Sequence, residues 1–441
     1  MNISIDSTIT HRKVWALAGP IMISNISVPL VGAVDTAVVG RLPEPQAMGA
    51  VALGALIFSF LFWGFGFLRM GTTGFVARAL GANDQQALSD TLLRVLLLAL
   101  MLGFLIILLS RPVIGFALYL LESSVEVEQL TASYAGIRIW SAPATLLIYV
   151  FTGVFIGMHN TGKAFVLQLI LNISNMLLDV LFVIVFGMGV EGVALATVIA
   201  EYLAVFCGFI LLRQPILTAI KQFDWQRLVE RHALVQLMSA NGNIFIRTLC
   251  LVFSFAYFTA LSAKMGEVVL AANAILLHLQ SIMAYGLDGF AHAAEALTGS
   301  AYGAGRRKQF SRSVKLTSLW AAIIAGLVSL MYLFFGKPIL GLFTNIDSVL
   351  DAAAVYLPWM IISPLISIWS FQLDGIFIGA GYTREMRNAM LFSMLAYLLL
   401  LSVLIPWWGN HGLFLSLSLF MLIRALTLGF YYPRILAAIG R

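Results

Sequence analysis

Twelve long apolar runs, separated by short polar segments, constrain what this chain can fold into. Each run holds at least about 17 residues, the length at which a helix crosses the roughly 30 Å hydrocarbon core of a bilayer. Lipid offers no hydrogen-bond partner to the backbone, so each run must be a helix that satisfies its own amides and carbonyls. The sequence therefore predicts an all-α integral membrane protein with twelve transmembrane helices.

The predicted spans form two sets of six. The first set covers residues 14–41, 50–74, 91–110, 130–157, 164–186 and 192–212. The second set covers residues 237–261, 268–301, 316–335, 352–379, 389–405 and 413–431. Only 10% of the residues are charged, against about 25% in a soluble domain, which agrees with this interpretation. The net charge of +6 comes from bases in the predicted loops, so nucleic acid is not an expected partner.

The lysines and arginines predict the orientation of these spans. With the N-terminus inside, 18 of the 26 basic residues lie on the inner side and only 4 on the outer side. Cytoplasmic loops carry such an excess, and a missed span would have scrambled it. Both termini are therefore expected in the cytoplasm.

The second half of the chain repeats the first. A gapless offset of 222 positions places Phe-Ile-Gly at 155–157 on Phe-Ile-Gly at 377–379, and places Gly81 on Gly303. Duplicated apolar chains are typical of secondary transporters, and an even number of spans per repeat gives both halves the same topology. We expect an N-terminal lobe over 1–213, a cytoplasmic linker over 214–235 and a C-terminal lobe over 236–441.

Polar side chains gather in the outer half of the predicted N-terminal lobe. Asp35 lies about 9 Å below the outer end of its helix, at 1.5 Å per residue, and Asp179 lies a similar distance below the end of its own. Asn175 shares a helix face with Asp179, and Thr197 lies at a similar depth. Close carboxylates do not both ionise cheaply, so this cluster predicts a proton carrier, or a site where a cation such as Na⁺ replaces the proton. The alternative is that each buried acid pairs structurally with an intramembrane arginine such as Arg138.

The first predicted span also carries a candidate hinge. Pro29 removes a helix hydrogen bond six residues before Asp35, and Gly32 adds no bulk. Prolines are common in transmembrane helices, so an ordinary bend and a bend tied to the charge of Asp35 both stay open.

The predicted C-terminal lobe has a polar stripe of its own. Tyr285, Asp288, His292 and Glu295 share one helix face, and Asp374 lies in the inner half of another span. These groups form either a second proton-relay site or structural ion pairs. The acids of the first lobe have no copies here, because the offset places Asp35 and Asp179 on uncharged residues.

No metal-ligand spacing and no intact nucleotide motif occur in the sequence. The run 157–163 matches the GxxxxGK pattern, but Ala164 follows where the magnesium-binding Ser or Thr belongs. We expect no cofactor beyond a coupling ion, and a transporter driven by an ion gradient rather than an enzyme.

Several segments together resemble the multidrug and toxic compound extrusion (MATE) family. Residues 28–40, 171–179 and 192–197 are similar to its first-, fifth- and sixth-helix signatures. Residues 285–290 and 373–379 resemble the DinF-type branch. The resemblance covers nearly the whole chain.

The resemblance implies a twelve-helix, two-lobe exporter in the bacterial inner membrane, expected to act as a monomer. It implies exchange of small amphipathic, often cationic, drug-like compounds for external H⁺ or Na⁺. Positions matching Asp35, Asn175, Asp179 and Thr197 form the family's cation and proton site, and Tyr134 matches a cavity residue. The acidic pair of the Na⁺-coupled NorM-type branch has no evident match, which favours H⁺. A flippase for a lipid-linked precursor, which predicts an arginine-rich cavity, and a passive channel are the alternatives.

Overall fold

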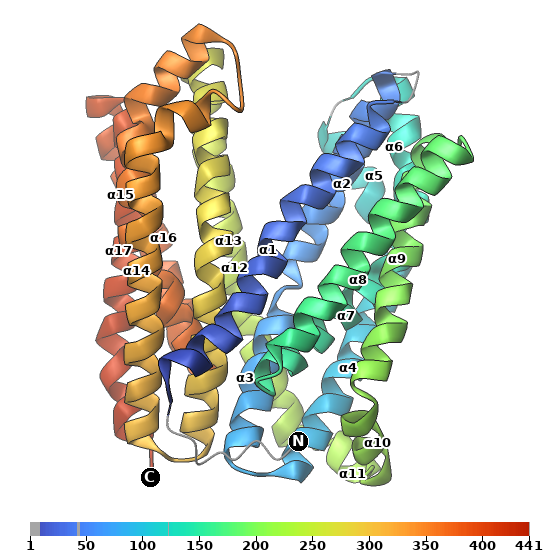
Figure 1. Cartoon of the computed structure of the whole chain (residues 1–441), viewed down its shortest axis with the longest axis vertical. Coiled ribbons are helices and arrows are strands. Elements are labelled where there is room, and N and C mark those ends of the chain that lie inside the picture. The colour runs from blue at the N-terminus through green and yellow to red at the C-terminus, as the bar shows by residue number, and fades with distance from the viewer. Residues whose placement is uncertain (1–8, 42–44, 122, 441) are drawn as a thin grey trace. The chain divides into compact units, whose positions relative to one another are not determined.

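The computed structural model describes residues 9–41, 45–121 and 123–440 (Figure 1). The side chains of seven residues between 28 and 36, among them Pro29 and Asp35, lie outside this description. Every regular element in the described part is helical, which confirms the predicted fold class.

Thirteen helical elements occupy the first half of the chain. They are α1 (His11–Val39), α2 (Pro45–Gly64), α3 (Phe67–Gly81), α4 (Gln85–Leu108), α5 (Ser110–Leu121), α6 (Val125–Arg138), η1 (Ile139–Ser141), α7 (Ala142–Gly157), α8 (Thr161–Asp179), the π-helix η2 (Val180–Val185), α9 (Gly189–Leu211), α10 (Arg213–Lys221) and α11 (Trp225–Leu228). The predicted linker is thus partly helical, in α10 and α11.

Six longer helices make up the second half. They are α12 (Arg231–Ala263), α13 (Glu267–Gly303), α14 (Arg307–Leu340), α15 (Asp347–Ala380), α16 (Thr383–Trp408) and α17 (Asn410–Ala438). Figure 1 shows them as long rods that run along one another.

The described part contains 11 helical segments long and apolar enough to cross a membrane. They correspond to eleven of the twelve predicted spans, and α1 occupies the twelfth. Two of the predicted spans are interrupted, which the hydrophobic periodicity of the sequence did not indicate. The span predicted over 50–74 is divided between α2 and α3 at Phe65 and Gly66, and the span over 130–157 is divided by η1 just before Pro143.

The chain forms two compact units. The C-terminal unit contains Met1–Met22, Ala77–Asn83 and Gln236–Arg441. The N-terminal unit contains Ile23–Val76 and Asp84–Val235. Both α1 and α3 therefore pass from one unit to the other within a continuous helix, a division that hydropathy does not reveal.

The first turns of α1 belong to the C-terminal unit because their side chains pack into its core. Val14 and Leu17 are buried there with Phe290 of α13. The indole ring of Trp15 lies edge-on to Phe290 at 5.3 Å and to Trp320 at 5.2 Å, between ring centroids. Edge-on aromatic pairs add to the free energy of burial, so this end of α1 is firmly held.

The end of α3 joins the same unit through repeat partners. An added Cβ at Gly81 would meet the backbone of Ser300, and one at Gly303 would meet the backbone of Arg78. These residues are related in pairs by the 222-residue offset, so the contact is reciprocal. The Arg78 Nη1 also donates to the carbonyl of Gly379 at 3.0 Å.

Glycines allow close helix packing at equivalent places in both units. On α7, a Cβ at Gly153 would meet the carbonyl of Arg69, and one at Gly157 would meet the carbonyl of Thr73. Small residues four positions apart let two membrane helices approach closely.

The same arrangement recurs between α15 and α13. A Cβ at Gly375 would meet the carbonyl of Ala291, and one at Gly379 would meet the carbonyl of Glu295. All four positions are those of the first repeat shifted by 222. The repeat found in the sequence is therefore present in the helix contacts.

We expect Gly379→Leu to destabilise the protein, because the added side chain has no room against α13. Overpacking of a tight contact typically costs roughly 1–3 kcal/mol. Thermal unfolding of the purified protein measures the loss. The control is Gly326→Leu on α14, where an added Cβ meets no atom within 4 Å. Equal melting temperatures for the two variants would contradict the packing argument.

Candidate functional site

The predicted N-terminal cluster is built on one face of α8. Asp179 is fully buried, and Asn175, one turn earlier, is 5% exposed. The Asn175 Nδ2 donates to Thr197 Oγ1 of α9 at 3.3 Å, and the Thr197 hydroxyl donates to the Val193 carbonyl at 3.0 Å. Three of the predicted residues are thus on adjacent helices, two of them joined directly.

Asp179 lies where the helix geometry changes. It is the last residue of α8, and the π-helix η2 begins at Val180. π-Helical segments are rare and occur frequently at functional sites, because they reposition side chains and loosen the backbone ladder. The hydrophobic pattern contains no signal for this change.

The rest of the predicted cluster is on α1. The backbone of α1 is one helix across Pro29 and Asp35, and both side chains lie outside the described residues. At Gly32 an added Cβ would meet no described atom within 4 Å. The roles of Asp35 and of the Pro29–Gly32 hinge stay predictions.

A polar link between α8 and α1 was not predicted. The Asn172 Nδ2 donates to Ser27 Oγ at 2.7 Å, and the Gln168 Nε2 donates to Asn172 Oδ1 at 2.8 Å. Gln168 and Asn172 lie on the same face of α8 as Asn175 and Asp179. Their helical spacing is a feature of the sequence from which both residues could have been predicted. The helix with the buried acid is therefore hydrogen-bonded to the α1 segment before the candidate hinge.

Arg138 has a different partner from the one considered in the sequence. Its Nη2 donates to Glu201 Oε1 at 2.7 Å, and the other carboxylate oxygen of Glu201 accepts from the Thr145 hydroxyl. Glu201 is thus a buried acid paired with an intramembrane arginine, the arrangement considered above as the structural alternative for Asp35 and Asp179. Tyr134 lies one turn before Arg138 on α6, is 5% exposed and packs with Phe58 at 6.3 Å between ring centroids.

In the C-terminal unit, Asp374 is at the centre of an ion cluster. Its Oδ2 accepts from Arg247 of α12 and from Arg424 of α17, and all three side chains are buried. Asp288 of α13 also interacts favourably with Arg424. This geometry favours the structural ion-pair alternative for Asp374.

The predicted stripe on α13 runs from exposed to buried. Tyr285 is 38% exposed, Asp288 and His292 are half-buried, and Glu295 is 1% exposed. Glu295 therefore sits where its helix packs closely on α15. Among the described side chains, to which that of Asp35 does not belong, no three His, Cys, Asp or Glu residues form a metal-binding group.

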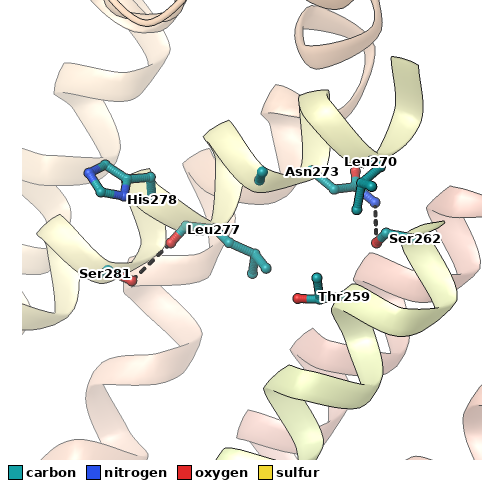
Figure 2. A pocket seen from close by; sticks show the side chains of 8 residues that line it. Thr259, Ser262, Leu270, Asn273, Leu277, His278 and Ser281 are labelled. Carbon is teal, nitrogen blue, oxygen red and sulfur yellow. Dashed lines mark hydrogen bonds between the residues drawn. The ribbon is translucent and has the colours of Figure 1, made fainter. Parts of the chain in front are cut away.

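A pocket of about 260 Å³ opens between α12 and α13, next to the turn that joins them (Figure 2). Its polar lining residues are Thr259, Ser262, Asn273, His278 and Ser281. None of the residues predicted from the sequence lines it. Isolated hydroxyl and amide residues on apolar helices carry no spacing signal, so the sequence alone did not indicate this pocket.

Comparison with known proteins places the chain among membrane exporters. A family model described as MatE matches residues 20–181 and again residues 244–403, one match in each repeat. DNA damage-inducible protein F of Escherichia coli (strain K12) is 40% identical over 427 residues, which cover 97% of this chain and 93% of that protein. A probable multidrug resistance protein NorM of Idiomarina loihiensis is 24% identical, in an alignment that covers 88% of this chain and 84% of that protein.

Solved structures share the fold. A MOP superfamily transporter from Pyrococcus furiosus superposes with a TM-score of 0.90 at 18% identity, over 99% of this chain and 98% of that one. An outward-facing multidrug resistance transporter of the same superfamily gives a TM-score of 0.88 at 19% identity, over 98% of this chain and 97% of that one.

Proposed function

Because the chain belongs to the MATE family of multidrug efflux transporters, we propose that it is an H⁺-coupled antiporter for amphipathic organic cations. The polypeptide is a multi-pass membrane protein. In the proposal it is a monomer in the bacterial inner membrane with both termini in the cytoplasm. The bacterial relative that is 40% identical supports the choice of membrane, and the excess of basic residues in the predicted inner loops supports the orientation.

The observation that carries the proposal is the buried Asp179. A carboxyl group with no exposed surface among helices is costly to ionise, so it favours binding a proton and releases it when its surroundings become more polar. Asn175 and Thr197 beside it supply neutral hydrogen-bonding groups. In our scheme an external proton reaches Asp179 and Asp35.

Protonation then alters the hydrogen bonds that hold α1. The helix bends near Pro29, and the bound substrate is displaced outward. Release of the proton to the cytoplasm restores the inward-facing state for the next substrate. The Asn172–Ser27 hydrogen bond of 2.7 Å supports this step, because it connects α8 to the part of α1 that would move.

The coupling ion and the direction of transport can be tested together. A fluorescent cation such as ethidium is added outside everted vesicles that contain the protein, under an imposed ΔpH or an imposed ΔNa⁺, each without the other. We expect uphill movement with ΔpH alone. Uphill movement only with ΔNa⁺ would identify Na⁺ as the coupling ion and contradict the proposal. Movement that never exceeds the equilibrium distribution would favour a passive channel.

The flippase alternative needs arginines free to bind a pyrophosphate. The buried Arg247 and Arg424 instead share the carboxylate of Asp374, and Arg138 pairs with Glu201. Because these guanidinium groups already have anionic partners, we favour a cationic substrate.

A further inference from the structure

The pocket between α12 and α13 lies wholly within the C-terminal unit and outside the proposed coupling site. Its volume of about 260 Å³ exceeds that of a few water molecules, at roughly 30 Å³ each. Figure 2 shows the two helices diverging from their common turn, with Thr259 projecting from α12 toward α13.

The hydroxyl groups around the pocket have already used their only donors. Thr259 donates to the Phe255 carbonyl at 3.2 Å, and Ser281 donates to the Leu277 carbonyl at 3.0 Å. A hydroxyl has one hydrogen and two lone pairs, so each of these groups presents only acceptors to a ligand.

The floor of the pocket is held by a closed amide network. The Asn273 Nδ2 donates to Ser262 Oγ at 2.8 Å and to Asn410 Oδ1 at 2.7 Å. The Asn410 Nδ2 returns a hydrogen bond to Asn273 Oδ1 at 2.8 Å. Asn273 and Ser262 are almost fully buried, so the acceptors above them stand on a rigid base.

The remaining lining completes an amphipathic site. Leu270, Ala274 and Leu277 provide apolar surface, and His278 lies edge-on to Phe343 at 5.6 Å between ring centroids. The described lining residues include no carboxylate, lysine or arginine. A ligand here would meet apolar side chains, the hydroxyl acceptors of Thr259 and Ser281, and the His278 imidazole, whose neutral form has one donor and one acceptor nitrogen.

We propose that this pocket binds organic ammonium groups that carry N–H bonds, with the apolar part of the ligand against the leucines. The Thr259 and Ser281 oxygens accept from the ammonium. The proposal deepens the proposed function, because such amines would be cargo, but binding is measurable without transport. The same chemistry occurs in a soluble amine and in the headgroup of phosphatidylethanolamine.

The test compares benzylammonium with benzyltrimethylammonium, which has the same ring and charge but no N–H. Saturation-transfer NMR on the full-length protein in phosphatidylcholine–phosphatidylglycerol nanodiscs gives both affinities. We expect benzylammonium to bind at least about tenfold more tightly, since a hydrogen bond to a charged group contributes roughly 1.5 kcal/mol or more. Thr259→Val and Ser281→Ala should each weaken benzylammonium about tenfold and leave benzyltrimethylammonium nearly unchanged.

Thr218→Val on α10 is the matched control, because Thr218 is exposed and donates to the Gln214 carbonyl at 3.0 Å but does not line the pocket. Equal affinity for the two ligands, or equal losses in the Thr259 and Thr218 variants, would overturn the proposal.

Adding phosphatidylethanolamine to the nanodiscs distinguishes a lipid headgroup from a soluble amine as the occupant of the pocket. Weaker benzylammonium binding then identifies the lipid headgroup as an occupant, and unchanged binding assigns the pocket to soluble amines. Failure of ΔpH-driven transport with intact binding would reject only the proposed function.

Discussion

Asp179→Asn is expected to reduce drug-driven H⁺ exchange in everted vesicles to the level of vesicles that lack the protein. The amide has the size of the carboxyl group but does not titrate near neutral pH, so the fully buried site stays in its proton-loaded form. The fluorescence of a dye quenched by the acidic vesicle interior should recover on addition of ethidium, and this recovery measures the exchange. We expect the same loss for Asp35→Asn.

Two further variants separate coupling from folding. Asp179→Glu keeps a titratable group and should retain part of the exchange. Glu191→Gln is the control, because Glu191 is an exposed acid of the same unit that accepts from Ser133 Oγ at 2.7 Å. Preserved H⁺ exchange in Asp179→Asn would rule out Asp179 as the coupling residue.

The second large effect is expected for Asp374→Ala, and it is a loss of stability. Removal of this carboxylate leaves Arg247 and Arg424 buried and facing each other. Breaking a buried ion cluster at one partner typically costs about 3–5 kcal/mol. Thermal unfolding of the purified protein should show a markedly lower melting temperature.

Removing the whole cluster should be much less harmful than removing its centre. We expect Arg247→Met, Asp374→Leu and Arg424→Met together to recover most of the lost stability, because no uncompensated charge stays buried. Asp224→Ala, which breaks an exposed pair with Arg227 at 3.5 Å, should have little effect. A stable Asp374→Ala variant would instead indicate that Asp374 is held for function.

The internal repeat shows how much of the contact geometry can be predicted from the sequence. Matching letters at an offset of 222 placed Gly153 and Gly157 on Gly375 and Gly379, and the structure places both pairs against the carbonyls of equivalent neighbours. Both repeats have glycine at these two contacts, because any side chain there collides with backbone. Sequence identity within the chain thus predicted contact geometry.

The ion-pair partners of the buried charged residues were much less predictable from the sequence. The sequence offered Arg138 as a neighbour for the coupling acids, but its partner is Glu201, 63 positions later. Asp374 pairs with residues 127 positions before it and 50 after it. Many acid–base combinations satisfy the same hydropathy, and only the packing of the helices selects among them.

The pocket lined by Thr259 and Ser281 was missed for a related reason. A hydroxyl that bonds to its own helix has no effect on hydrophobic periodicity. Its remaining lone pairs matter only where a second helix diverges, and this divergence is a property of α12 and α13 together (Figure 2).

The sequence by itself determined the all-helical class, the membrane spans, the repeat and the position of Asp179 in its helix. These properties follow from local hydropathy and helical spacing, because lipid leaves a backbone no other way to satisfy its hydrogen bonds. The tertiary structure alone decided the passage of α1 and α3 between units, the partners of the buried arginines, the π-helix after Asp179 and the pocket between α12 and α13. Each of these depends on contacts between segments far apart in the chain, whose energies no single segment contains.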